Sequence, residues 1–191
     1  EELGDVLYPD RHGTMFSGSC AVDFDNTSGF QTGDEKVIIA AYSAARPEKQ
    51  VQCIAYSNDR GRTFTKYDGT PVIDSKEKWK TIETRDPKVF WHEDTQKWIM
   101  VLFERNGHSI YTSDDMKEWT YQSHIGGFWE CPELFELAVD GDENNKKWVM
   151  YGVLGTYLIG DFDGKVFTPE TEMLRYNIGG MTAAQTYNDE P

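Results

Sequence analysis

Two acidic residues, Glu130 and Asp86, occur in short motifs whose composition suits acid–base chemistry. Glu130 lies between Trp129 and Cys131, an apolar setting that would favour the neutral acid if the side chain were buried. Asp86 follows Arg85, whose charge would instead hold a carboxylate ionised. A protonated and an ionised carboxyl group that face one cavity are the basic apparatus of glycoside hydrolysis. The motifs therefore predict Glu130 as a proton donor and Asp86 as its acidic partner.

A degenerate internal repeat places these two motifs at equivalent positions along the chain. One copy begins at Asp86 and the next at Cys131, and each continues into a strand that starts with Lys-Trp and aliphatic residues. The second copy reaches that strand after a longer turn. A weaker copy begins near Ala21, and a fourth begins near Met181. The repeat predicts one structural unit that recurs along the chain.

The repeating unit is a set of short strands separated by Asp, Asn and Gly turns. A period of roughly 40–50 residues with four short strands is typical of β-propeller blades, and a β-sandwich built from similar hairpins is the alternative. We predict an all-β fold, a partial β-propeller over residues 1–191 with about three four-stranded antiparallel blades and part of a fourth. The expected strands are Lys36–Tyr42, Val51–Ser57, Lys88–Trp91, Lys97–Phe103, Ser109–Ser113 and Lys147–Val153.

Strand alternation conflicts with a shared pocket for the two acids. When the copies are aligned on their prolines, Glu130 takes the place of Arg85, and Asp86 takes that of Cys131. Because successive side chains of a strand point to opposite faces, regular strands would send Glu130 and Asp86 to opposite faces. A twist or a bulge near the strand start would let both reach one pocket. On the residues alone, a salt bridge between Arg85 and Asp86 and a catalytic role for Asp86 carry equal weight.

The charge of the chain favours a neutral ligand. Nineteen basic and 33 acidic residues give a formal net charge of −14, which opposes binding to nucleic acid and to anionic membranes. It does not oppose a neutral carbohydrate, and the aromatic content of 14% supplies flat rings that suit the apolar faces of sugars. We therefore expect a carbohydrate substrate, no nucleic-acid partner and no membrane partner.

The cysteines and histidines show no ligand spacing. The cysteines are Cys20, Cys53 and Cys131, an odd number, so a disulfide framework is not expected, although one bridge is compatible with them. The histidines are not spaced as metal ligands, so we expect no metal and no cofactor. The first residues lack the basic and apolar regions of a signal peptide, and a targeting peptide would lie upstream of this chain, so no compartment is assigned.

Several motifs occur in the order and approximate spacing of glycoside hydrolase family 32, the family of invertases, levanases, inulinases and fructan exohydrolases, which the chain resembles. The motifs are Phe16-Ser17-Gly18-Ser19, Asn26-Thr27-Ser28-Gly29, Arg85-Asp86-Pro87 and Glu130-Cys131-Pro132. The similarity extends over essentially the whole chain. It implies a five-bladed propeller and a retaining hydrolase of β-fructofuranosides such as sucrose, levan or inulin.

The resemblance also implies roles for individual residues. Glu130 matches the general acid/base, and Asp86 matches the transition-state stabiliser that holds sugar hydroxyls, with Arg85 beside it. Phe16 and Ser17 match residues that line the fructose subsite. Arg85 and Trp129, which lie next to the proposed stabiliser and the proposed acid, are further substrate-binding candidates.

One expected element is missing from the sequence. The family nucleophile is an aspartate in an Asn-Asp-Pro-Asn-Gly motif on the first blade, and these 191 residues contain no such motif. We therefore expect a catalytic-domain fragment that lacks the first blade and the C-terminal β-sandwich of the family and is inactive alone. Asp10, Asp23 and Asp25 lie near the start but lack the context of the nucleophile. The exposed edges of an open propeller could also support self-association.

Other functions remain open on the sequence. A five-bladed glycosidase of arabinan or xylan also uses inward carboxylates, and a sugar-binding module that has lost the first blade would need no nucleophile. A propeller that serves as an interaction scaffold is the third alternative, because fold alone does not fix function.

Overall fold

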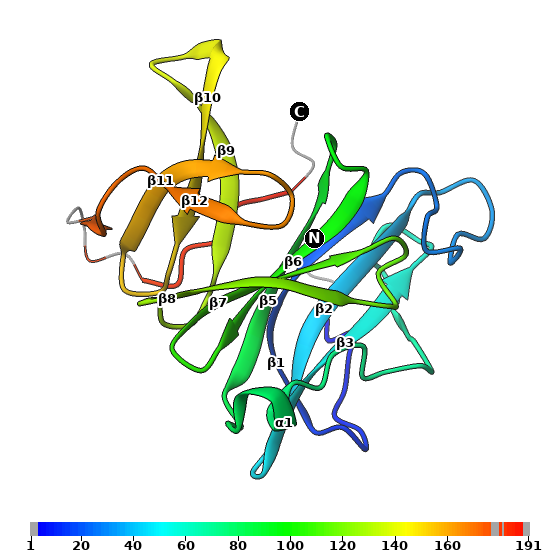
Figure 1. Ribbon diagram of the computed structural model, residues 1–191. Coiled ribbons are helices and arrows are strands. Elements are labelled where there is room, and N and C mark those ends of the chain that lie inside the picture. Colours follow the sequence, from blue (N-terminus) through cyan, green and yellow to red (C-terminus); the bar gives the residue numbers. More distant parts are fainter. Residues whose placement is uncertain (1–3, 177–179, 181, 189–191) are drawn as a thin grey trace.

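The computed structural model describes residues 4–176, 180 and 182–188. Its strands form three antiparallel sheets, each built from consecutive segments of the chain (Figure 1). The first sheet has the order β1-β2-β3-β4 and contains β1 (Thr14–Asp23), β2 (Val37–Arg46), β3 (Lys49–Ser57) and β4 (Thr65–Lys66). The second has the order β5-β6-β7-β8 and contains β5 (Thr84–His92), β6 (Lys97–Glu104), β7 (Gly107–Ser113) and β8 (Thr120–Gly126).

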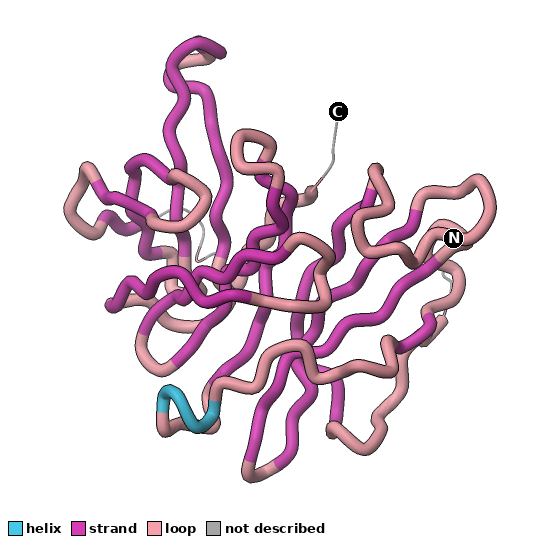
Figure 2. The backbone as a smooth tube through the Cα atoms, turned by 45° about the vertical axis from the view of Figure 1, so that its right-hand side comes forward, coloured by secondary structure: helices cyan, strands magenta, loops and turns pink. Residues whose placement is uncertain are grey.

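The third sheet follows the same plan with one addition. It has the order β12-β11-β10-β9, and its strands are β9 (Glu133–Val139), β10 (Asp142–Tyr151), β11 (Thr156–Phe162) and β12 (Phe167–Pro169). A short strand, β13 (Leu174–Arg175), pairs with β11 as well. The described elements also include one short helix, α1 (Lys76–Trp79), between the first two sheets. Strands account for nearly all the regular structure in Figure 2.

The three sheets are blades of a partial β-propeller and do not close a ring. Each blade is a meander of four strands, as the repeat predicted, and the predicted all-β propeller fold is confirmed. The first strands of the blades, β1, β5 and β9, are the inner strands of this arc. No helix in the described part of the chain is long and apolar enough to cross a membrane.

The central blade contributes to two of the three hydrophobic clusters in the described residues, and the third lies within the first blade. Trp98, Met100 and Leu102 of β6 pack into a cluster with the first blade, whereas Ile99 and Val101 pack into a cluster with the third. Because alternate residues of a strand face opposite sides of its sheet, a strand between two blades needs apolar residues at every position. This requirement explains the unbroken apolar run of β6.

The longer turn predicted in the third blade has become strand. The β9–β10 hairpin projects from the rest of the molecule (yellow in Figure 1). Its pairing is irregular near the tip, where Asp142 pairs with Val139 but Lys146 pairs with Ala138. The extra residues therefore lengthen the hairpin and form a bulge, which leaves the inner part of the blade in register with its neighbours.

The predicted fourth copy of the repeat forms no strand in the described residues. Met181, where it was expected to begin, lies outside them, and residues 182–188 form a loop without regular secondary structure. Side chains of this loop contact all three blades. Gln185 donates a hydrogen bond to the backbone oxygen of Gly18 in β1 (3.1 Å), and Asn188 donates one to that of Val89 in β5 (2.7 Å). Thr186 donates to a side chain of β9.

Candidate active site

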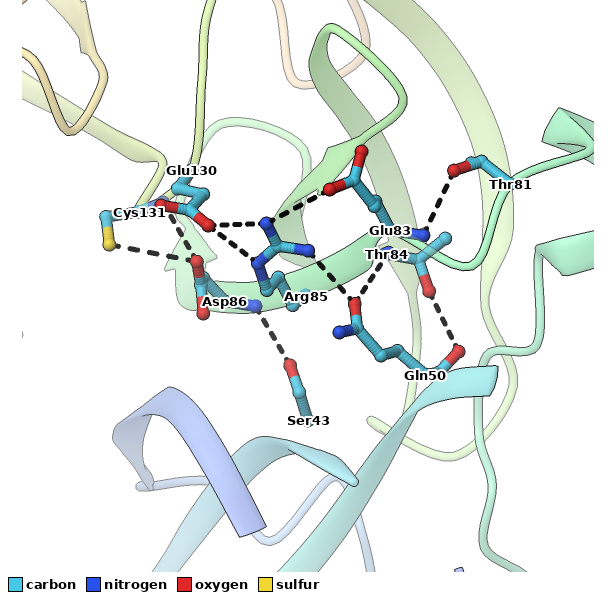
Figure 3. A network of polar contacts seen from close by, with 9 residues as sticks. All are labelled: Ser43, Gln50, Thr81, Glu83, Thr84, Arg85, Asp86, Glu130 and Cys131. Carbon is cyan, nitrogen blue, oxygen red and sulfur yellow. Dashed lines mark hydrogen bonds and ion pairs between the residues drawn. The ribbon is translucent and has the colours of Figure 1, made fainter. Parts of the chain in front are cut away.

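Backbone irregularities bring the two predicted acids together. The pairing of β5 with β6 shifts between Arg85 and Lys88, and Asp86 within that bulge has a φ of 61°. Glu130 and Cys131, just before β9, also have positive φ values of 24° and 45°. A residue in a bulge no longer follows the alternation of its strand. The conflict between alternation and a shared site is resolved by the bulge, and Glu130 and Asp86 lie in one polar network (Figure 3).

Backbone groups hold Asp86 in place. Its backbone N–H donates a hydrogen bond to Ser43 Oγ (2.9 Å), and its Oδ2 accepts one from the backbone N–H of Cys131 (3.1 Å). Burial raises the pKa of Asp86 above its ordinary value, and the charge of Glu130 acts in the same direction. The N–H of Cys131 and the charge of Arg85 oppose this rise in the pKa of Asp86. Asp86 is 9% exposed, which makes it a nearly buried carboxyl group with one side held by backbone.

Arg85 contacts the other acid. Its Nε donates to Glu130 Oε1 at 3.0 Å, and its Nη2 also contacts that oxygen. The ion pairs of Arg85 within the described residues are with Glu130 and, at 3.7 Å, Glu83. The salt bridge between Arg85 and Asp86, one of the two alternatives for Asp86, is therefore not among the ion pairs of the described residues. Nη1 of Arg85 donates to Gln50 Oε1 (3.2 Å), which fixes the guanidinium from the first blade.

The surroundings of Glu130 are more polar than its sequence neighbours, Trp129 and Cys131, suggested. Its side chain is 32% exposed and paired with Arg85, so the condition of burial under which its apolar neighbours would favour the neutral acid is not met. Trp129 is 40% exposed, and its ring lies 5.0 Å from that of Phe103. The guanidinium of Arg85 also lies 5.0 Å from the Phe103 ring. Phe103 thus supports both the guanidinium that pairs with Glu130 and the aromatic ring beside it.

In the Phe16-Ser17-Gly18-Ser19 motif, the glycine and the second serine have structural roles. A Cβ at Gly18 would lie 2.0 Å from the backbone oxygen of Ala41, so any side chain would collide with β2. Ser19 Oγ donates to the backbone oxygen of Pro87 (3.0 Å) and accepts from the N–H of Val89 (2.9 Å). These bonds join β1 to the bulge of β5. Gly18 and Ser19 therefore help to fix the position of the Asp86 segment.

Phe16 and Ser17 lie in a second bulge. Met15 pairs with Ala44 and Gly18 pairs with Tyr42, so the two intervening residues of β1 oppose only Ser43. Both are exposed, Phe16 to 47%. Ser43 is the residue that accepts the hydrogen bond from Asp86, so the Phe16–Ser17 bulge and the Asp86 bulge lie on either side of one hydroxyl group.

Several residues of this network carry no signal in the sequence. Ser43 also donates to Gln52 Oε1 (2.8 Å), and Gln52 Nε2 donates to the backbone oxygen of Thr84 (2.7 Å). Gln50 Oε1 accepts from the N–H of Thr84 (3.1 Å) as well as from Arg85. Gln52 lies within the predicted strand Val51–Ser57, Ser43 and Gln50 lie just outside predicted strands, and no motif distinguishes them from other polar residues. Only the structure reveals that they connect the first blade to the start of β5.

A buried histidine lies behind the loop that carries Glu130. His108 is fully buried, its ring stacks on Phe128 at 4.6 Å, and neither ring nitrogen has a hydrogen-bond partner of good geometry in the described part of the chain. Burial lowers the pKa of His108 to about 3, an effect that the nearby backbone of Glu130 and Trp129 opposes. His108 is therefore neutral at physiological pH. The spacing of the histidines bears only on metal binding, and no sequence pattern indicates that His108 is buried behind this loop.

The thiol beside the acid is not poised for nucleophilic attack. Burial raises the pKa of Cys131 to about 12, and the charges of Asp86 and Glu130 act in the same direction. A thiol with such a pKa stays protonated at neutral pH, and the thiolate is the nucleophilic form. Cys20, Cys53 and Cys131 are all free. Among the described residues, no group of His, Cys, Asp and Glu is arranged to hold a metal ion.

Two carboxyl groups at the start of neighbouring inner strands are the kind of arrangement that carboxylate-based glycosidases use. The particular family is identified by sequence: the model of the glycosyl hydrolases family 32 N-terminal domain matches residues 1–191. The chain belongs to this family, as its motifs had indicated.

Curated relatives support the assignment. A levanase from Bacillus subtilis (strain 168) is 49% identical over 212 residues, an alignment that covers 100% of this chain and 31% of the levanase. An extracellular exo-inulinase from Meyerozyma guilliermondii is 37% identical over 214 residues, which cover 100% of this chain and 41% of the inulinase. The chain thus spans about a third of the length of the levanase and well under half of the inulinase.

Solved structures agree with the fold. The fructofuranosidase from Schwanniomyces occidentalis complexed with fructose has a TM-score of 0.86 and 36% identity, and the match covers 97% of this chain and 40% of that one. The exo-inulinase from Aspergillus awamori has a TM-score of 0.80 and 33% identity, with coverage of 93% and 43%.

Proposed function

We propose that this chain is part of the catalytic propeller of a retaining β-fructofuranosidase that acts on sucrose or on fructans such as levan and inulin. The observation that carries the proposal is the network in which Asp86, Arg85 and Glu130 meet across two blades (Figure 3). Membership of family 32 and the names of the relatives, a levanase and an exo-inulinase among them, support the substrate class.

In this proposal Glu130 is the general acid/base. As the acid it donates a proton to the glycosidic oxygen, and as the base it later removes one from the attacking water. Its side chain is partly exposed and can reach a substrate, whereas Arg85 lies against one carboxylate oxygen. Once the proton has left, the guanidinium of Arg85 stabilises the resulting carboxylate. Arg85 thus supports the form of Glu130 that must activate water.

Asp86 has a different role. Its Oδ2 is held by the Cys131 amide, and a carboxylate fixed in this way accepts hydrogen bonds from two sugar hydroxyls without reorganisation. Such bonds strengthen as the transition state gains oxocarbenium character. Phe16 and Ser17, exposed in the β1 bulge, and Trp129, exposed beside Glu130, complete the proposed fructose subsite.

The covalent step requires a nucleophile that we assign to none of these residues. The carboxylate of Asp23 already accepts hydrogen bonds from Thr27 and Ser28, and that of Asp10 pairs with Lys66. Asp25 is exposed but lies beyond the end of β1, away from the Phe16 bulge at its start. We therefore propose that the nucleophile comes from outside residues 1–191 and that the 191-residue chain alone does not turn over substrate.

The test uses the full-length protein and measures release of reducing sugar from sucrose, inulin and levan. Aryl arabinofuranosides and xylosides serve as comparison substrates for the alternative five-bladed glycosidases. We expect hydrolysis of fructosides only, and an Asp86→Asn variant that loses about 100-fold or more in kcat/KM. Hydrolysis of arabinosides or xylosides in preference to fructosides would refute the proposed substrate class.

A further inference from the structure

We propose that a second carbohydrate-binding site lies between the first and second blades, at the end of the inner strands remote from Asp86. A pocket of about 300 Å³ is lined there by Phe24 and Asp25, which follow β1, and by Trp91 and Glu93 at the end of β5. The proposal rests on the proposed function for its ligand, a fructosyl unit of a polymeric substrate. The site would hold the polymer without taking part in catalysis.

The position of the pocket separates it from the proposed active site. Asp86 lies near the start of β5, and Trp91 lies five residues further along the same strand. A strand rises about 3.3 Å per residue, so their backbones are separated by roughly 16 Å. The same holds for β1, which carries Phe16 near its start and leads into Phe24 at its end. One fructosyl unit therefore cannot contact both sites, whereas one polymer chain can.

The aromatic wall on β5 is held in a fixed orientation. The ring of Trp91 packs edge-on against that of Trp98, with centroids 5.2 Å apart and an interplanar angle of 67°. Trp98 is buried, and its Nε1 donates a hydrogen bond to Thr27 Oγ1 (2.8 Å). Trp91 itself is half-buried, which leaves part of its ring open to the pocket. A preorganised ring of this kind loses little conformational entropy when an apolar sugar face stacks on it.

The opposite wall is a turn that its own side chains stabilise. Asp23 accepts hydrogen bonds from the backbone N–H groups of Thr27 and Ser28, both at 2.9 Å, and from their hydroxyls. Lys36 Nζ donates to the backbone oxygen of Phe24 (2.7 Å). The side chain of Phe24 nevertheless remains 53% exposed. The turn thus presents a large apolar ring to solvent on a backbone that is fixed at both ends.

The polar groups of the pocket select a neutral, hydroxyl-rich ligand. Asp25 and Glu93 are both exposed, and ionised carboxylates accept hydrogen bonds from sugar hydroxyls. Neither Lys nor Arg is among the described residues that line the pocket, so an anionic ligand would be repelled. Two aromatic walls combined with carboxylate acceptors match the amphipathic surface of a fructosyl unit.

The experiment measures retention of the full-length protein in gels that contain levan or inulin, relative to gels without polymer. A Glu130→Gln background slows turnover of the polymer by about 100-fold or more. We expect Trp91→Ala and Phe24→Ala each to weaken retention by about tenfold. Tyr8→Ala, which removes an exposed ring elsewhere in the first part of the chain, is the matched control and should leave retention unchanged.

Kinetics of the same substitutions in the active background separate the two proposals. If both hold, Phe24→Ala raises KM for the polymer and leaves kcat/KM for sucrose unchanged. Suppose that the parent protein releases fructose while Trp91→Ala and Phe24→Ala both keep full retention on the polymer. That result would overturn the second site and leave the proposed function standing. Absence of fructoside hydrolysis by the parent would overturn the proposed function instead. Because Phe24 is exposed, its variant keeps the test valid even if Trp91→Ala unfolds.

Discussion

The backbone N–H of Cys131 donates a hydrogen bond of 3.1 Å to Oδ2 of Asp86, which joins the loop that carries Glu130 to the bulge of β5. Both partners have positive φ values. Two irregular segments on neighbouring blades therefore fix each other, and the positions of the two carboxyl groups are coupled through main chain. Site geometry fixed in this way resists thermal motion more than side chains on a mobile loop would.

Replacement of Arg85 by lysine tests the contact with Glu130. Arg85 reaches one carboxylate oxygen through two nitrogens and lies over the ring of Phe103, and a lysine ammonium cannot reproduce this planar arrangement. We expect Arg85→Lys to lower kcat on sucrose by about tenfold or more through misplacement of Glu130. The control is Glu83→Gln, which removes the more exposed and more distant partner of Arg85. Equal effects of the two substitutions would contradict this account.

Asp86→Asn is expected to separate stability from activity. Burial raises the pKa of Asp86, so the folded state holds its proton to higher pH than the unfolded state does. Ionised Asp86 therefore destabilises the fold at pH values above its raised pKa, and this cost disappears as the pH falls below the ordinary value of 3.8. Asparagine carries no such cost and still accepts a hydrogen bond from Cys131.

We therefore expect the inactive Asp86→Asn variant to have an equal or greater free energy of unfolding at pH 7 than the parent, with the difference shrinking towards acidic pH. Chemical denaturation over a pH series measures it. A variant that is less stable at pH 7, with a deficit that grows as pH rises, would show that ionised Asp86 stabilises the fold.

The bulges mark the limit of what the sequence could predict about the site. The repeat correctly placed the segments of Asp86 and Glu130 at equivalent positions of consecutive blades, because strand and turn patterns depend on local composition. The contact of Arg85 with Glu130 depends on the backbone of the bulge, where Asp86 has a positive φ before Pro87. Local composition does not encode that φ value. The pairing of Arg85 with Glu130 was therefore not anticipated, although Arg85, Asp86 and Glu130 were all singled out by the sequence.

His108 should make stability depend on pH. The ring of an unfolded chain takes up a proton below its ordinary pKa of about 6.5, whereas the folded ring stays neutral until the pH approaches its pKa of about 3. The unfolded state thus binds more protons in this window, and the free energy of unfolding falls as pH falls, by up to ~1.4 kcal/mol per pH unit. His124 and the backbone around Glu130 are the neighbours that modulate this effect.

The measurement compares the parent with His108→Asn, whose side chain does not titrate, by chemical denaturation between pH 4 and pH 7. The parent should lose stability more steeply than the variant as the pH falls. Parallel pH profiles would mean that folded His108 accepts a proton without loss of stability. The pKa of His108 would then not be lowered by its burial.

A buried ion pair joins the inner strands of the second and third blades. Lys88 Nζ lies 3.1 Å from Glu133 Oε2, and both side chains are 3% exposed. Removing one partner leaves a buried charge unpaired, so Lys88→Met should destabilise the protein by about 3–5 kcal/mol. The double variant Lys88→Met/Glu133→Leu should recover most of that loss. A control in the exposed pair of Lys80 and Glu77 should have no measurable effect.

This ion pair was invisible to sequence reasoning for a physical reason. Lys88 was placed correctly in an inner strand, where lysine normally points to solvent. Its burial depends on Glu133 and on Thr186, whose hydroxyl and backbone oxygen both accept hydrogen bonds from its ammonium group. Because these partners lie far away in the sequence, local patterns contain no trace of the cluster. Contacts between blades were the least predictable part of the fold.

The role of Glu130 as proton donor is the central claim, and its dependence on the leaving group tests that role most directly. The measurement is kcat/KM of the Glu130→Gln variant and the parent, in the full-length protein, on sucrose and on an aryl β-fructofuranoside. A sugar leaving group needs protonation and an acidic phenol does not, so the variant should lose about 100-fold or more on sucrose and far less on the aryl substrate. Equal losses on both substrates would contradict the assignment of Glu130 as the acid.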